Sequence, residues 1–138
     1  MKYITGYHAL NLPCSLGTTG DWHRFCYDWE NPRTKDSDNS IFGEYGIETN
    51  RDLSFVGLGK NCKVANHIRA CLDIMEDGHL GGIKFFTSDF LDDDPKIVDQ
   101  MLQKCLLFKN TDTWDDVNSF LNKEKYREWN NVKKRLGT

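Results

Sequence analysis

Side chains capable of acid–base chemistry are concentrated between Gly6 and Asn31, a stretch that contains two of the four histidines. Two imidazoles and a carboxylate can transfer protons near neutral pH without a metal ion. A small metal-independent hydrolase or ribonuclease is therefore one hypothesis for the function. Its candidate catalytic residues are His8, Asp21, His23, His67 and Arg69. Arg69 would bind a phosphate group of the substrate.

The same side chains also have a structural interpretation, which we favour because buried polar groups normally serve structure. In this interpretation the Asp21 carboxylate caps a short helix and His8 bonds a backbone group. Trp22 and Trp29 then fill the core with their rings. Arg69 lies on a solvated helix face, where an ion pair contributes little to stability.

A different hypothesis assigns the tryptophans to an interface, because Trp is enriched among the residues that dominate binding energy. The chain is small, contains 12% aromatic residues and carries no recognisable catalytic motif. The leading expectation is therefore a non-enzymatic protein-binding or regulatory component with a protein partner. Its candidate partner-binding residues are Asn11, Trp22, Trp29 and Asn66.

A structural zinc site is the third hypothesis. His23 with Cys26, and His67 with Cys71, are two pairs that would together complete a tetrahedral site. One pair falls on an amphipathic helix rather than on a tight knuckle. Cys71 belongs to the apolar face of that helix, where cysteine usually packs as a small hydrophobic side chain. We therefore predict no metal and no cofactor.

The five cysteines are an odd number in a chain that begins without the apolar run of a signal peptide. Free thiols in a reducing cytoplasm are the simplest account, and we expect a cytoplasmic protein. Cys14 lies in a turn-rich loop and would be a nucleophile if His8 or His23 served as its base. Nothing in the sequence places these residues within reach of each other.

Composition argues against two classes of partner. The net charge is −3, with 28% charged and 38% hydrophobic residues, and no basic block is present. A general nucleic-acid-binding surface is therefore not expected, although a local basic patch is compatible with the sequence. No stretch approaches the ~20 apolar residues of a membrane span, so no membrane partner is expected.

The amino-terminal half of the chain is predicted to be rich in strands. Runs of strand-forming residues predict strands over 2–10 and 40–50. Residues 52–58 are compatible with another strand or an extended run, and a short strand over 82–87 is a further candidate. Polar residues 31–40 are predicted as a surface loop. Residues 22–29 are compatible with either a short helix or a strand, because the window is too short for periodicity to decide.

Helices are predicted in the carboxyl-terminal half from apolar residues at three- and four-residue spacing. They comprise a helix over 62–76, one with Pro95 in its first turn, one capped by Thr113 and one over 123–136. Because strands and helices are segregated along the chain, we predict an α+β fold, with residues 1–138 as a single domain. A β-rich amino-terminal half would pack against three to four helices of the carboxyl-terminal half.

Motifs of the first half resemble those of a family of small uncharacterised bacterial proteins: HALNLPC from His8, GDWH from Gly20 and ANHIRA from Ala65. The family's genes are similar to ones found beside abortive-infection nucleotidyltransferase toxins. The resemblance therefore implies a bacterial defence or toxin–antitoxin setting, but no role for any residue. Cys26 and Cys71 lie outside the pattern. The polar residues within it are His8, Asn11, Asp21, His23, Asn66, His67 and Arg69.

Overall fold

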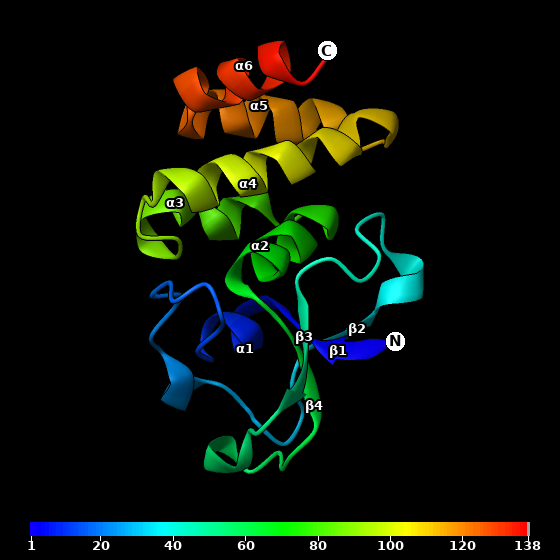
Figure 1. The fold of residues 1–138 in the computed structure, drawn as a ribbon, viewed down its shortest axis with the longest axis vertical. Coiled ribbons are helices and arrows are strands. Elements are labelled where there is room, and N and C mark those ends of the chain that lie inside the picture. The colour runs from blue at the N-terminus through cyan, green and yellow to red at the C-terminus, as the bar shows by residue number, and fades with distance from the viewer. Residues whose placement is uncertain (138) are drawn as a thin grey trace.

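A computed structural model describes residues 1–137, which form a four-stranded mixed sheet and six α-helices. The sheet lies towards one end of the long axis, and the last helices form the other end (Figure 1). The strands are β1 (Lys2–Ile4), β2 (Thr34–Asp36), β3 (Ile47–Arg51) and β4 (Cys62–Ala65). The helices are α1 (Gly6–Leu10), α2 (His67–Glu76), α3 (Phe86–Asp89), α4 (Pro95–Cys105), α5 (Trp114–Glu124) and α6 (Tyr126–Arg135).

The central strands of the sheet, β1 and β4, are parallel, whereas β2 and β3 pair antiparallel at the two edges. The register sets Ile4 opposite Val64, so both central strands end at the same edge of the sheet. Helix α1 follows β1, α2 follows β4, and the two helices pack against each other. The loop that leaves α1 is thereby brought beside the first turn of α2.

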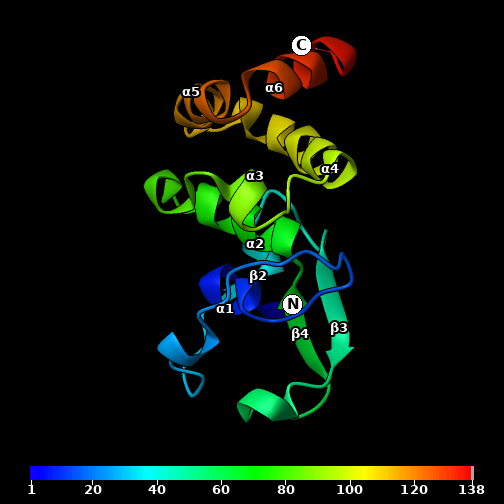
Figure 2. The same ribbon diagram turned by 90° about the vertical axis from the view of Figure 1, so that its left-hand side faces the viewer.

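Helix α2 is the centre of the molecule. It contacts β4 and α1 on one side and α4 on the other, and α5 and α6 lie beyond α4 (Figure 2). Every residue from His67 to Met75 is buried. The helix predicted over 62–76 therefore begins later than expected, because Cys62–Ala65 pairs with both β1 and β3 as the strand β4. No helix among the described residues is long and apolar enough to cross a membrane.

The predicted α+β organisation is confirmed. All four strands lie within residues 2–65, and four helices of 10 or 11 residues follow them. Helices α4, α5 and α6 confirm the predictions from apolar spacing, with Pro95 in the first turn of α4 and the Asp94 side chain as its cap. Thr113 precedes α5 as predicted, but its side chain makes no capping bond.

Two predictions near the amino terminus were wrong in detail. The strand predicted over 2–10 ends at Ile4, because the next residues form the single turn of α1 and bury Ala9 and Leu10. The surface loop predicted over 31–40 contains β2, which pairs with β1 despite its polar composition. In both cases packing against distant residues overrides the local pattern.

Three further strand predictions need correction. The strand predicted over 40–50 begins only at Ile47, after a series of turns. The run over 52–58 contains a 3-10 helix, η3 (Ser54–Val56), in place of a strand. The short strand predicted over 82–87 is wrong, because this segment forms a 3-10 turn followed by the start of α3.

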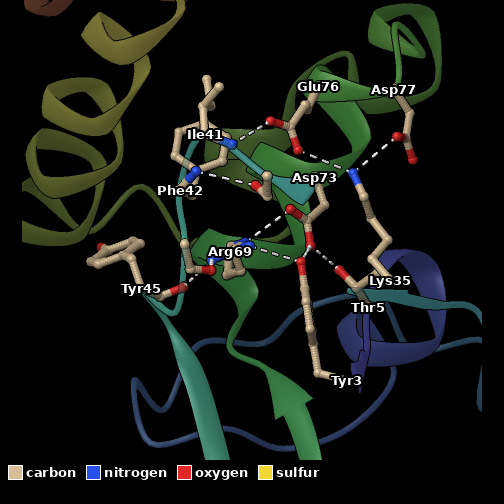
Figure 3. Close-up of polar contacts among 12 residues, drawn as sticks. Tyr3, Thr5, Lys35, Ile41, Phe42, Tyr45, Arg69, Asp73, Glu76 and Asp77 are labelled. Atoms are coloured by element: carbon tan, nitrogen blue, oxygen red, sulfur yellow. Dashed lines mark hydrogen bonds and ion pairs between the residues drawn. The ribbon is translucent and has the colours of Figure 1, made fainter. Parts of the chain in front are cut away.

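A buried ion pair on α2 joins that helix to β1 (Figure 3). Arg69 Nε donates to Asp73 Oδ1 over 2.9 Å, and the two side chains are 0% and 1% exposed. The hydroxyls of Tyr3 and Thr5 each donate to Asp73 Oδ2 over 2.6 Å, and Tyr3 accepts a bond from Arg69 Nη2. Burial and the bond to Asp73 raise the pKa of the Tyr3 hydroxyl, which therefore stays protonated as a donor.

The polar ends of α2 connect it to the rest of the amino-terminal half. Nη1 of the buried arginine donates to the carbonyls of Gly43 and Tyr45, in the segment before β3. At the other end of the helix, Lys35 of β2 forms ion pairs with Glu76 and Asp77. No buried side-chain nitrogen or oxygen in residues 1–137 lacks a hydrogen-bond partner. The network is therefore fully satisfied, as a buried charge requires.

We predict that Asp73→Ala lowers the free energy of unfolding by about 3–5 kcal/mol, because it leaves the Arg69 charge buried without its partner. Urea unfolding followed by circular dichroism measures the loss. The control is Asp99→Ala, which removes the exposed ion pair with Arg135 and should cost less than about 1 kcal/mol. Equal, small losses for the two variants would contradict the central role of the buried pair.

Candidate functional site

The segment from Asn11 to His23, termed the site loop, leaves α1 and returns to the end of the same helix. The N–H of Asp21 donates to the carbonyl of Leu10 over 2.8 Å. The N–H of Gly20 donates to the carbonyl of Phe90, beyond α3, over 3.0 Å. These bonds fix the end of the loop between α1 and the segment that follows α3.

The Asn11 side chain closes the base of the site loop. Its amide group donates to the Tyr7 carbonyl over 2.7 Å and to Asp21 Oδ2 over 3.2 Å. Its carbonyl oxygen accepts the backbone N–H of His23 over 2.7 Å. Asn11 was predicted to bind a partner, yet it is buried and its amide group bonds α1 and the site loop. These contacts shape the loop.

Asp21 and His23 form a dyad at the surface. Asp21 Oδ1 lies 2.5 Å from Nδ1 of His23, whose side chain is 60% exposed. Among the described residues, none bonds the other ring nitrogen, Nε2. A carboxylate that orients an imidazole in this way is the arrangement of a general base. The helix-capping role expected for Asp21 is absent, since residues 22–29 contain only a 3-10 turn without a side-chain cap.

His8 is held away from this dyad. Its Nδ1 accepts the backbone N–H of Arg33 over 3.1 Å, so Nε2 carries the proton that it donates to the Asp28 carbonyl over 2.9 Å. Its ring packs against those of Tyr27 and Trp29 at centroid distances of 5.3 and 5.0 Å. Both nitrogens therefore serve backbone groups, in agreement with the structural interpretation of His8.

Asn66 and Arg69 also have structural partners. Asn66 caps α2, since its Oδ1 accepts the backbone N–H of Arg69 over 2.8 Å. The expectation that Arg69 lies on a solvated face is wrong, because its side chain is 0% exposed. All three guanidinium nitrogens donate within the protein. Of the five predicted catalytic residues, only Asp21 and His23 bond each other.

His67, the first residue of α2, connects to Cys14 across the site loop. The imidazole is 1% exposed, and its Nε2 lies 2.7 Å from the Leu12 carbonyl, to which it must donate. Its Nδ1 lies 2.6 Å from the Thr18 hydroxyl, and that oxygen lies 3.8 Å from Cys14 Sγ. The three side chains form a continuous thiol–hydroxyl–imidazole chain, termed the thiol relay (Cys14, Thr18, His67).

Contacts within the thiol relay lower the pKa of the Cys14 thiol and raise the pKa of the His67 imidazole. Burial alone would raise the pKa of the Cys14 thiol, but hydrogen bonding and charge from His67, with backbone N–H groups of His67 and Leu16, lower the pKa. Burial alone would lower the pKa of His67, but Cys14, the Leu12 carbonyl and the charge of Glu48 raise it. Both shifts favour a thiolate beside an imidazolium.

Exposed aromatic side chains gather beside the site loop. Trp22, Phe25 and Phe55 are 80%, 94% and 53% exposed. The Arg24 guanidinium carbon lies 5.5 Å from the ring centroid of Phe25 and 5.2 Å from that of Phe55, and so joins residues distant in sequence. Trp22, Arg24, Phe25 and Phe55 are termed the aromatic patch. A hollow of about 330 Å³ adjoins it, lined in part by Trp22, Arg24 and Phe25.

Trp29, predicted as either a core residue or an interface residue, lies between the core and the aromatic patch and supports the patch. It is half-buried and packs against the core. Its indole N–H donates to the backbone carbonyl of Arg24 over 2.9 Å. That bond holds the 3-10 helix η1 (Arg24–Cys26), which presents Arg24 and Phe25. The prediction that Trp22 fills the core is wrong, because its ring is exposed.

The four proposed zinc ligands do not form a site. In the described part of the chain, no three His, Cys, Asp or Glu side chains are grouped as a metal centre requires. His23 bonds Asp21, whereas His67 bonds Thr18 and Leu12. Cys71 is fully buried in the apolar core, where burial raises the pKa of its thiol.

Two features of the site were missed from the sequence. A histidine base for Cys14 was sought in His8 or His23, but its partner is His67, which lies across the interface of α1 and α2. The contact of Arg24 with Phe55 was also missed, because Arg24 lies just after the site loop and Phe55 lies between β3 and β4. Neither contact leaves a local pattern in the chain. The one sequence signal that connects Cys14 with His67 is that both belong to the motifs of the resembled family.

We predict that Gly20→Ala lowers the free energy of unfolding by about 2–4 kcal/mol and disturbs the site loop. Gly20 has a φ of +65°, and an added Cβ would clash with the Leu10 carbonyl oxygen and lie 2.7 Å from the His67 ring. Gly17→Ala is the matched control, since Gly17 has a φ of +72° with open space around it and should cost only about 1 kcal/mol. Thermal and urea unfolding measure both losses, and equal costs would show that backbone conformation alone constrains Gly20.

The motifs behind the family resemblance meet in space. The first runs from α1 into the site loop, the second ends that loop, and the third runs from the end of β4 into α2. Asn11, Asp21 and His23 bond one another, and His67 bonds Thr18 of the same loop. The assignment to a family stays a prediction. Comparison with known proteins finds no matching family model, no matching curated protein and no matching solved structure.

Proposed function

We propose that this protein is a non-enzymatic protein-binding or regulatory component, and that the aromatic patch is its binding surface. The observation that carries the proposal is the exposure of Trp22, Phe25 and Phe55. Arg24 joins the rings of Phe25 and Phe55, and Trp22 lines the adjacent hollow with Arg24 and Phe25. Leaving three large rings in water is unfavourable unless a partner covers them. Trp and Arg are also the residues that most often dominate the energy of protein interfaces.

The patch is prepared for binding before a partner arrives. Trp29 supports η1 through the bond to the Arg24 carbonyl, and Arg24 is placed over two rings. Little side-chain entropy then remains to be lost by the arginine on association. The adjacent hollow has the volume for one apolar side chain of a partner.

The partner that fits is a protein segment with an apolar anchor for the hollow and a carboxylate or carbonyl oxygen for Arg24. Nucleic acid fits less well. Among the described residues that line the hollow, Arg24 is the single basic side chain and Asp21 contributes a carboxylate. In keeping with the family resemblance, we place the partner in a bacterial defence or toxin–antitoxin locus, and the protein in the cytoplasm.

We predict that Trp22→Ala weakens the partner complex by about 30-fold in Kd, the loss expected from a central aromatic contact. Native mass spectrometry of the protein expressed with its neighbouring genes identifies the partner, and calorimetry then gives Kd. Tyr126→Ala is the matched control, because Tyr126 is 68% exposed on α6, away from the patch. An unchanged Kd for Trp22→Ala and Phe25→Ala, or no complex with any neighbouring product, would refute the proposal.

A second candidate, a metal-independent hydrolase or ribonuclease, is favoured by the Asp21–His23 dyad and its open Nε2. If the dyad is catalytic, His23→Ala lowers the rate of hydrolysis by about 100-fold or more, while the exposed ring leaves the melting temperature unchanged. His79→Ala, which changes another exposed histidine, is the control. Equal rates for His23→Ala and the wild type on RNA and ester substrates would dismiss this candidate.

A further inference from the structure

Cys14 is the one thiol that the structure couples to a base. Cys71 and Cys105 are buried in the core, where burial raises the pKa of both. Cys26 is more exposed than Cys14, but no histidine contacts its sulfur. Cys62 donates only to backbone carbonyls. Accessibility and chemical activation therefore coincide at Cys14 alone among these five side chains.

The thiol relay has a complete hydrogen-bond pattern in both of its protonation states. In the neutral state the Cys14 thiol donates to Thr18 Oγ1, and the Thr18 hydroxyl donates to His67 Nδ1. After proton transfer the imidazolium Nδ1–H donates to Thr18, whose hydroxyl donates to the thiolate. Nε2 donates to the Leu12 carbonyl in either state, which holds the ring in place. The proton can therefore move with no rearrangement of heavy atoms.

The surroundings of the relay favour the charged state. The sulfur interacts with the backbone N–H of His67, at the N-terminus of α2, and with that of Leu16. Glu48 of β3 contributes negative charge that stabilises the imidazolium, and it also accepts bonds from the N–H and hydroxyl of Ser15. Arg51 pairs with Glu48 and donates to the Pro13 carbonyl, which limits the net charge on the loop.

We propose that Cys14 is a thiol-modification site that exchanges with low-molecular-weight disulfides. The Cys14 sulfur attacks one sulfur of the small disulfide, the S–S bond of the small molecule breaks, and a new S–S bond to Cys14 forms. The departing thiolate takes the proton of the His67 imidazolium, through the Thr18 hydroxyl, and leaves as a thiol. Cys14 is oxidised, the small disulfide is reduced, and no other reagent is consumed. All five cysteines are free in the structure, so the product is a mixed disulfide.

This reactivity does not depend on the protein-binding function. The test uses glutathione disulfide as the probe, with peptide mapping by mass spectrometry to follow Cys14 and Cys26 in the same sample. At about pH 6.5, Cys14 should react faster than Cys26, because a lowered thiol pKa raises the fraction of thiolate by more than it lowers the nucleophilicity of the sulfur. A faster reaction at Cys26, or none at Cys14, would overturn the proposal.

The pH profile of the Cys14 rate separates the relay from simple exposure. We expect an inflection below the ordinary thiol pKa in the wild type, and an upward shift of that inflection in His67→Gln. Thr18→Val, which removes the hydroxyl and keeps its shape, should also shift the inflection, whereas Thr18→Ser should preserve it. Melting temperatures identify any variant that fails to fold, and the two Thr18 variants retain His67. An inflection that is unchanged in both His67→Gln and Thr18→Val overturns the proposal.

Discussion

The buried ion pair between Arg69 and Asp73 is the interaction on which the amino-terminal half depends. Two charges are taken out of water at a cost that only complete pairing offsets. The pair meets that requirement with groups from two distant segments: the hydroxyls of Tyr3 and Thr5, and two backbone carbonyls before β3. Each of these segments is short and irregular. A three-residue strand cannot hold its place by its own ladder, so the polar centre of α2 specifies where these segments lie.

The same helix explains how a structural element can also carry chemistry. The first residues of α2 meet the site loop, and its middle meets the sheet. Asn66, His67, Arg69 and Asp73 all lie within two turns, yet only His67 faces a group that titrates near the surface. The ion pair and the N-cap position the helix, and the helix in turn sets the distance between His67 and the site loop. Stability and reactivity are thus assigned to different residues of one element.

What could be predicted from the sequence is what depends on local spacing. The apolar faces of α4, α5 and α6 repeat every three or four residues, and their helices formed as expected. The polar residues of α2 led to a wrong prediction. The spacing of Arg69 and Asp73 is typical of an exposed helix face, and their buried partners lie far along the chain. The strands escaped prediction for a related reason: β2 is polar and three residues long, and only pairing with β1 makes it a strand. In the site, the neighbours Asp21 and His23 were found, whereas the link from Cys14 through Thr18 to His67 was not.

The parallel pairing of β1 with β4 has a consequence for the way the protein is made. Its register joins residue 4 to residue 64, so the first strand emerges from the ribosome long before its central neighbour exists. Until then β1 has only the antiparallel β2 available, and Tyr3 and Thr5 have no carboxylate to bond. Contacts of such high contact order form slowly, because the intervening chain must be ordered first. The helices α4 to α6, which rely on near neighbours, need no such delay, and the amino-terminal half is therefore the part that completes folding last.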